Sequence, residues 1–291
     1  MPSDSTQPPV AAAPDEQRAQ DMNWKLAAVP FGVLLLIYLP TLYELFYDLW
    51  NDPNYSHGLL VPVVSVFLLW RKRDVLRSVP KSRDRLGLLL LIAGVGLFLV
   101  ANGAAEYFTL RMSLVITLFG LVWYLFGREF IKKTWFEFGF LVFMVPIPYV
   151  VYFSATVPLQ LIAAKISTFL LDLLGMSVAR QGNIIYLPGY ALEVAEACSG
   201  LRSLVSLLAL GALYAYLTQR TFTPRLLLFL STIPLAIVGN VVRVFVTSLL
   251  AYVVTTDVTA EPLHSLLGLI VFVVAFVFLF IFSAILKRIF K

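Results

Sequence analysis

The chain is made of long apolar blocks, 15 to 29 residues each, separated by short polar stretches, and no other feature limits its fold as strongly. Blocks of that length match the hydrocarbon core of a bilayer, which is about 30 Å thick. The sequence is 60% hydrophobic and only 13% charged, whereas a soluble domain is about 45–50% apolar and about 25% charged. We therefore predict an all-α polytopic membrane protein.

About eight transmembrane helices are expected, of which the second is short and contains Pro62. The polar, proline-containing stretch 1–25 is predicted to be a disordered cytoplasmic tail, and 26–291 is predicted to form a single transmembrane domain. The expected helices lie at about 26–47, 56–70, 86–102, 107–126, 134–149, 201–218, 226–254 and 265–286.

One further apolar segment, 150–175, is expected not to cross. Lys165, Thr168 and Asp172 recur on one face of a helix in this segment, so we expect it to lie in the outer interface or to be re-entrant. If it crossed, every later segment would be inverted and the last two basic stretches would face outward.

Basic residues flank the apolar blocks and indicate the orientation of the chain. With the N-terminal tail inside, the basic loops at 71–85, 127–133 and 219–225 and the C-terminus all lie inside, as the positive-inside rule requires. The outer loops 48–57, 103–106 and 255–263 then hold acidic residues and no Lys or Arg. No basic run alternates with aromatic residues, so the net charge of +5 does not indicate nucleic-acid binding.

The largest outer segment, 177–198, does not have a helical pattern. Turn signals stand at 182–183 and 188–189, and residues 190–194 alternate at strand spacing. We expect a small β-hairpin on the outer face that leads directly into a helix starting near Ser199.

Cys198 is the only cysteine, which excludes an internal disulfide and argues against a thiolate metal site. It directly precedes the expected helix, and Arg202 lies one turn further on. A helix N-terminus or a nearby cation lowers the pKa of a thiol from about 8.5 and so favours the nucleophilic thiolate. The alternative is that Cys198 is a small buried residue packed under the hairpin. We expect no metal and no cofactor.

The two histidines, His57 and His264, are both placed on the outer side, as Cys198 is. Pro262 is a helix start signal, so His264 belongs to the first turn of the last helix. A cysteine nucleophile needs a base within hydrogen-bond reach, and His264 is a candidate for it, with an interfacial polar residue as the alternative. His57 is a candidate for the lining of the same cleft.

Arg243 lies inside an apolar block, about 16 Å from its outer end at about 1.5 Å per residue. An arginine near the bilayer centre costs at least about 2.5–3.5 kcal/mol, so it is a functional candidate by default. Asn240 shares its helix face, and a structural clamp between helices is the alternative. This depth is in tension with a site at the outer face.

A thiolate, an imidazole and a guanidinium on one side of a membrane fit acyl transfer. Cys198 would attack a carbonyl, His264 would carry the proton to the leaving amine, and Arg243 would stabilise the oxyanion. The product would be a thioester that is open to water or to an amine.

The stretches "ACSGLRS" around Cys198, "NVVRV" around Arg243 and "HSLLG" from His264 resemble the exosortase/archaeosortase family, and "NYSHG" around His57 is similar to its first outer loop. The resemblance covers about 30–285. It implies a membrane cysteine transpeptidase or protease with Cys198 as nucleophile, Arg243 as the oxyanion or substrate arginine and His264 as acid/base. The supporting or substrate-binding residues are taken to be His57, Ser199, Gly200, Arg202 and Asn240.

For a bacterial member, the resemblance implies membrane-anchored substrates with a C-terminal sorting signal of the PEP-CTERM type, and a link to extracellular polysaccharide. The enzyme would lie in the inner membrane with cytoplasmic termini and a periplasmic active site. Two other classes remain open. A transporter for a polysaccharide precursor would need Arg243 but not Cys198, and an assembly scaffold would need neither.

Overall fold

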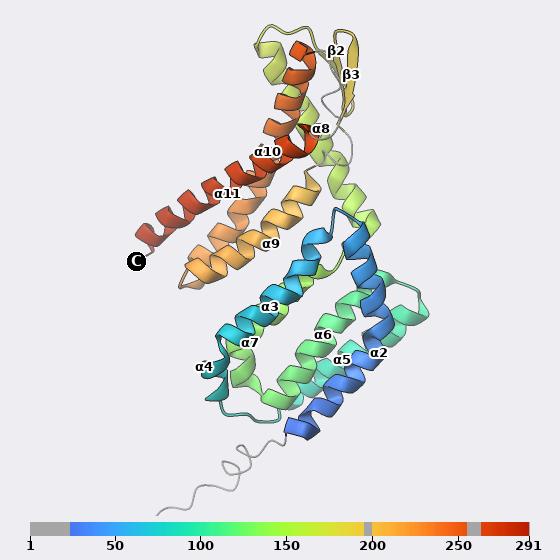
Figure 1. Ribbon diagram of the computed structural model, residues 1–291, viewed down its shortest axis with the longest axis vertical. Helices are drawn as coiled ribbons and strands as arrows, with labels where there is room; N and C mark the ends of the chain where they lie inside the picture. Colours follow the sequence, from blue (N-terminus) through green and yellow to red (C-terminus); the bar gives the residue numbers. More distant parts are fainter. Residues whose placement is uncertain (1–23, 195–199, 255–262, 291) are drawn as a thin grey trace, which may run out of the picture. The chain divides into compact units, whose positions relative to one another are not determined.

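The computed structural model describes residues 24–194, 200–254 and 263–290, which are mostly helical (Figure 1). This confirms the all-α polytopic membrane fold. The chain divides into two compact units, Met1–Val145 and Pro146–Lys291. The tail expected at 1–25 falls almost wholly outside the described residues, and the single domain stays a prediction. Helices long and apolar enough to cross a membrane are Ala28–Asn51, Arg85–Gly103, Tyr107–Phe126, Tyr149–Leu173, Leu201–Thr218, Phe222–Val253 and Leu266–Ile289.

The first unit is a set of helices in which α5 and α6 form a close antiparallel pair. Glycines allow the approach, because a side chain on Gly87 would meet the backbone of Tyr124 and one on Gly120 would meet that of Leu91. The elements are α2 (Trp24–Asn51), η1 (Ser56–Leu59), α3 (Leu60–Arg71), α4 (Arg73–Arg77), α5 (Arg85–Gly103), α6 (Tyr107–Phe126), α7 (Arg128–Phe140) and η2 (Leu141–Met144).

Polar side chains tie α2 to α6 within this unit. The Tyr38 hydroxyl lies 2.9 Å from both the Ser113 and the Thr117 hydroxyl oxygens, and all three side chains are buried. Nearer the other end of α2, Arg111 Nη2 donates to Asp48 Oδ2 at 2.5 Å. Buried polar groups are stable when they are hydrogen-bonded, so these contacts fix how the two helices align.

The described residues of the second unit form four long helices and a small sheet. Its elements are α8 (Tyr149–Leu173), β1 (Ala179–Gln181), β2 (Ile184–Leu187), β3 (Tyr190–Glu193), α9 (Leu201–Thr218), α10 (Phe222–Val254) and α11 (Leu263–Ile289).

The three strands form an antiparallel sheet in the order β1-β2-β3. Both turns lie where the sequence predicts them, and their glycines, Gly182 and Gly189, have positive φ values of 62° and 77°. The hairpin β2–β3 is confirmed, whereas β1 was not predicted because its three residues are all exposed and have no apolar alternation. Alternate side chains of β2 and β3, such as Ile185 and Leu192, are buried against the helices.

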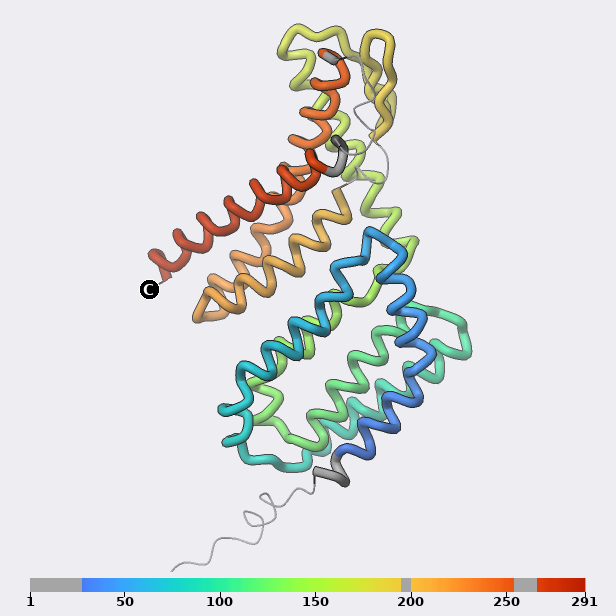
Figure 2. The backbone as a smooth tube through the Cα atoms, in the orientation of Figure 1, coloured from blue at the N-terminus to red at the C-terminus, as the bar shows by residue number. Residues whose placement is uncertain are grey.

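Helix α10 packs against different partners along its 33 residues. Its first half carries Leu228 and Ala236, which are buried among side chains of α9 and α11. Its second half carries Val241, Val244 and Ala251, which are buried among side chains of α8 and the sheet. The trace in Figure 2 follows α10 upward beyond the start of α11. The junction between the two halves lies near residue 240.

The prediction of a single helix at 134–149 is wrong. α7 ends at Phe140, the 3₁₀ turn η2 follows, and the chain is extended at Val145. Pro146 and Pro148 explain the break, because proline lacks an N–H and disfavours a helical residue before it. Inside α7, Glu137 is fully buried and its Oε1 lies 2.8 Å from Lys72 Nζ.

The expectation of a re-entrant segment at 150–175 is also wrong. Tyr149–Leu173 is one continuous 25-residue helix, with Pro148 at its N-cap, and its length and composition suffice for a membrane crossing. Lys165 and Asp172 are exposed, whereas Ser167 is buried and donates to the Val241 carbonyl of α10 at 3.3 Å. That the helix lies in the outer interface stays a prediction.

Candidate active site

Gly200 begins α9, two residues after Cys198. Its φ of 81° places it in the left-handed region, where glycine is favoured. It is buried, and a Cβ on it would lie 2.6 Å from Asn240 Cγ, which is closer than real side chains come. Ser203 Oγ donates to the Gly200 carbonyl at 2.9 Å and holds the first turn. Gly200, two residues after Cys198, therefore packs directly against the Asn240 side chain.

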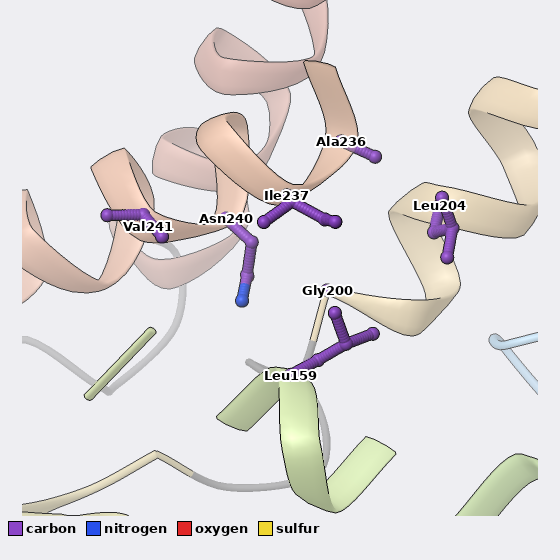
Figure 3. Close-up of a pocket in the computed structure, with 7 residues that line it drawn as sticks. All are labelled: Leu159, Gly200, Leu204, Ala236, Ile237, Asn240 and Val241. Carbon is purple, nitrogen blue, oxygen red and sulfur yellow. The ribbon is translucent and has the colours of Figure 1, made fainter. Parts of the chain in front are cut away.

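Asn240 lies on α10 and is 5% exposed. It projects into the space bordered by Gly200 and by Leu159 of α8 (Figure 3). Its Oδ1 is buried and has no hydrogen-bond partner within the described part of the chain.

Arg243 lies one turn further along α10 and faces a different helix. A Cβ on Gly268 of α11 would come within 3.3 Å of the Arg243 Cζ and Nη2 atoms, so the guanidinium rests on the glycine backbone. Gly268 is one helical turn after His264, because residues four apart lie on the same face. Arg243 is therefore close to the turn of α11 that follows His264.

These contacts bring three distant stretches of sequence together on two turns of α10. Asn240 contacts the start of α9, and Arg243 contacts the first part of α11. Cys198 and Ser199 lie outside the described residues, as does the side chain of His264. Their catalytic roles stay predictions, and the geometry concerns the residues directly beside them.

The depth assigned to Arg243 is explained by the length of α10. A helix of 33 residues is about 50 Å long, well beyond a bilayer core of about 30 Å. Because Asn240 touches the residue that begins α9, Arg243 stands near the level of that helix start. In a helix longer than the bilayer core is thick, distance from the helix end is not the same as depth in the membrane.

Arg243 lines two cavities. A groove of about 530 Å³ runs between α10 and α11 and is lined by apolar side chains such as Val242 and Val274. A smaller cavity of about 30 Å³ lies among α9, α10 and α11 and reaches Asn240 and Gly268. Arg243 thus borders both the apolar groove and the small cavity that reaches Asn240.

Two other predicted residues have different surroundings. Arg202 is exposed in the first turn of α9. His57 is half-buried in η1 of the first unit, next to Gly58, whose Cβ would meet side-chain atoms of Leu49. That His57 lines the same cleft stays a prediction. No cluster of three metal-binding side chains occurs in residues 24–194, 200–254 and 263–290.

Sequence reasoning missed the role of Gly268. The signal was present in "HSLLG", where a glycine follows His264 by one turn. A residue without a side chain at that spacing leaves room for a large group from another helix, and Arg243 occupies it.

The family model described as Transmembrane exosortase (Exosortase_EpsH) matches residues 49–281 of this chain. No curated protein matches the chain, and no solved structure does.

Proposed function

Because the chain belongs to the transmembrane exosortase family, a family of membrane sorting enzymes, we propose that it is a cysteine protease or transpeptidase that cleaves C-terminal sorting signals. The observation that supports this most is the pair of contacts on α10, where Asn240 meets Gly200 and Arg243 meets Gly268. In these contacts Gly200, two residues after Cys198, and Gly268, four residues after His264, pack against adjacent turns of α10.

The proposed reaction is acyl transfer through a thioester. His264 takes the thiol proton, the Cys198 sulfur attacks the scissile carbonyl carbon, and the C=O electron pair moves to oxygen as the C–S bond forms. When the C=O bond re-forms, the C–N bond breaks and the leaving nitrogen takes the proton from His264. Water or an amine then attacks the thioester and releases the Cys198 thiol. The positive charge of Arg243 favours the anionic intermediate or an acceptor group of the substrate.

The proposed substrates are exported proteins whose C-terminus holds a Pro-Glu-Pro-like motif, an apolar helix and a basic tail. Such a helix would fix the height of the scissile bond in the bilayer, which gives the enzyme proximity without a large binding surface. We place the enzyme in the bacterial inner membrane, with cytoplasmic termini, a periplasmic active site and a role linked to extracellular polysaccharide. The apolar groove beside Arg243 is compatible with a substrate in the membrane.

The test is a processing assay in cells that co-express the enzyme and a tagged substrate with a PEP-type tail. Wild type is expected to shift the size of the substrate, and Cys198→Ala is expected to abolish the shift. Lys165→Ala is the control, because Lys165 is an exposed cation on α8 of the same unit. Hydroxylamine should release a substrate fragment from wild type, as expected for a thioester.

Processing by Cys198→Ala at the wild-type rate would refute the nucleophile. A transporter predicts a different pattern, in which Cys198→Ala keeps polysaccharide export and Arg243→Ala loses it.

A further inference from the structure

A small cavity at the start of α9 is lined by apolar side chains and by a single buried amide. It has a volume of about 10 Å³ and lies among α8, α9 and α10 (Figure 3). Its apolar lining is Leu159, Leu204, Ala236, Ile237 and Val241. The rest of its lining is the backbone position Gly200 and the amide of Asn240. A space of this size holds about one water-sized group, which is the size of one oxygen atom with its hydrogens.

The Asn240 amide, which lines this cavity, is buried. Its Oδ1 is buried and makes no hydrogen bond to any described residue, and the side chain is 5% exposed. A buried polar group without a partner reduces stability, so native structures rarely retain one without a reason. A bound peptide could satisfy this acceptor with one of its N–H groups, and its carbonyl oxygen could accept from the Nδ2 end of the same amide.

The cavity also lies at the positive end of an 18-residue helix, α9, which starts at Gly200. The N-terminus of a helix favours negative charge because of the aligned peptide dipoles. An amide and a helix start that converge on a one-atom space are suited to an oxygen that becomes negatively charged. Cys198 is two residues from this point along the chain.

We propose that the Asn240 amide and the start of α9 form the oxyanion site, which holds the carbonyl oxygen of the scissile bond. This inference rests on the proposed function and deepens it. The Nδ2 group of Asn240 donates to the oxygen as the Cys198 sulfur adds to the carbonyl carbon and the C=O electron pair moves onto that oxygen. The Nδ2 end of the amide already lies on this side, because a Cβ on Gly200 would be 2.9 Å from Nδ2 and Figure 3 shows the amide nitrogen projecting into the space.

This assignment separates the roles of the two polar residues on α10. Asn240 faces the start of α9, whereas Arg243 rests on Gly268 of α11 and borders the apolar groove. Arg243 is then on the His264 side of the site, where it binds an acceptor group of the substrate.

The test compares two reactions of the same thiol in the full-length enzyme. Processing of the PEP-tailed substrate forms an oxyanion, but alkylation of Cys198 by iodoacetamide does not. Asn240→Ala should slow single-turnover processing about 10²- to 10³-fold, the usual effect of removing one oxyanion donor. Its alkylation rate and KM should stay within about threefold of wild type.

Asn240→Asp keeps the shape that packs on Gly200 and gives a pH signature. A carboxylic acid donates a hydrogen bond only while it is protonated, so the processing rate of this variant relative to wild type should fall as the pH rises. A purely structural role would instead make the alkylation rate of Cys198 and the unfolding midpoint of this variant change with pH in parallel with processing. Thr247→Val is the matched control, because Thr247 is also a buried α10 residue whose Oγ1 has no described partner.

The inference is overturned if Asn240→Ala processes substrate within about threefold of the wild-type rate. It is also overturned if alkylation of Cys198 slows as much as processing, because Asn240 would then act only by holding the Cys198 region in place. Those results leave the proposed function intact when Cys198→Ala remains inactive. Activity of Cys198→Ala would instead overturn the proposed function and this inference together.

Discussion

Gly200 carries two separate constraints, and Gly200→Ala is predicted to reveal both. Its φ of 81° strains any residue with a Cβ. The new Cβ would also lie 2.6, 2.7 and 2.9 Å from three atoms of Asn240. Asn240 is 5% exposed, and the cavities beside it measure only about 10 and about 30 Å³, so its side chain has little room to move. Gly175 provides the control, because it has a φ of 78° and nothing within 4 Å of its Cβ position.

The magnitudes follow from these two terms. The left-handed conformation costs about 1–2 kcal/mol for a residue with a Cβ, and this term is shared by Gly175→Ala. Overpacking adds about 1–3 kcal/mol at Gly200 alone. One kcal/mol shifts the unfolding midpoint of a chain of this size by about 2 °C. We expect Gly175→Ala to lower the midpoint by about 2–4 °C and Gly200→Ala by about 2–6 °C more.

The measurement is thermal unfolding in detergent, followed by intrinsic tryptophan fluorescence, together with the processing assay. Gly200→Ala should also slow processing, because it displaces the Asn240 amide, whereas Gly175→Ala should leave the rate unchanged. Equal midpoints for the two variants would refute the close packing of Gly200 on Asn240. Equal processing rates would refute the link between that packing and the reaction.

Two further predictions concern stability in the first unit. Lys72→Met should lower the free energy of unfolding by about 3 kcal/mol, because it removes the ion-pair partner of the fully buried Glu137. Lys132→Met, which removes an exposed ion pair on α7, the helix of Glu137, should lower it by less than about 1 kcal/mol. Similar midpoints for these two variants would contradict the burial argument. Asp84 caps α5 and accepts hydrogen bonds from the backbone N–H two residues on and from Trp123, which lower its pKa. Its contribution, about 1 kcal/mol against Asp84→Ala, should therefore be present above the ordinary pKa near 3.9 and disappear as the pH falls through the lower folded-state value. A difference in midpoint that does not change from pH 6 to pH 3 would contradict this cause.

The elements that sequence predicted well depend on local chemistry. Apolar blocks such as 107–126 became helices with the expected ends, since their length and composition leave few alternatives in a bilayer. The turns at 182–183 and 188–189 were also predicted, because glycine with positive φ is a local requirement.

The elements that were missed depend on tertiary packing. Hydropathy treats 134–149 and 150–175 as similar apolar segments, and only the two prolines at 146 and 148 mark the change from one helix to the next. The polar residues of the second segment suggested an interface, but its buried face is set by contacts with α10. No local pattern carries that information.

The site was predicted in its composition but not in its arrangement. The sequence identified Asn240 and Arg243 as neighbours on one helix face, as their spacing requires. It did not show that they contact two different helices, since that depends on Gly200 and Gly268, which are separated from them by loops.

The length of α10 has a mechanical consequence. Its second half is packed into the core formed with α8 and the sheet, and its first half into the core formed with α9 and α11. Asn240 and Arg243 lie between the two. A helix is stiff over a few turns. A force on the sheet would therefore tilt α10 and move the Asn240 and Arg243 side chains with it. A displacement of the second half of α10 is therefore expected to move the Asn240 and Arg243 side chains together.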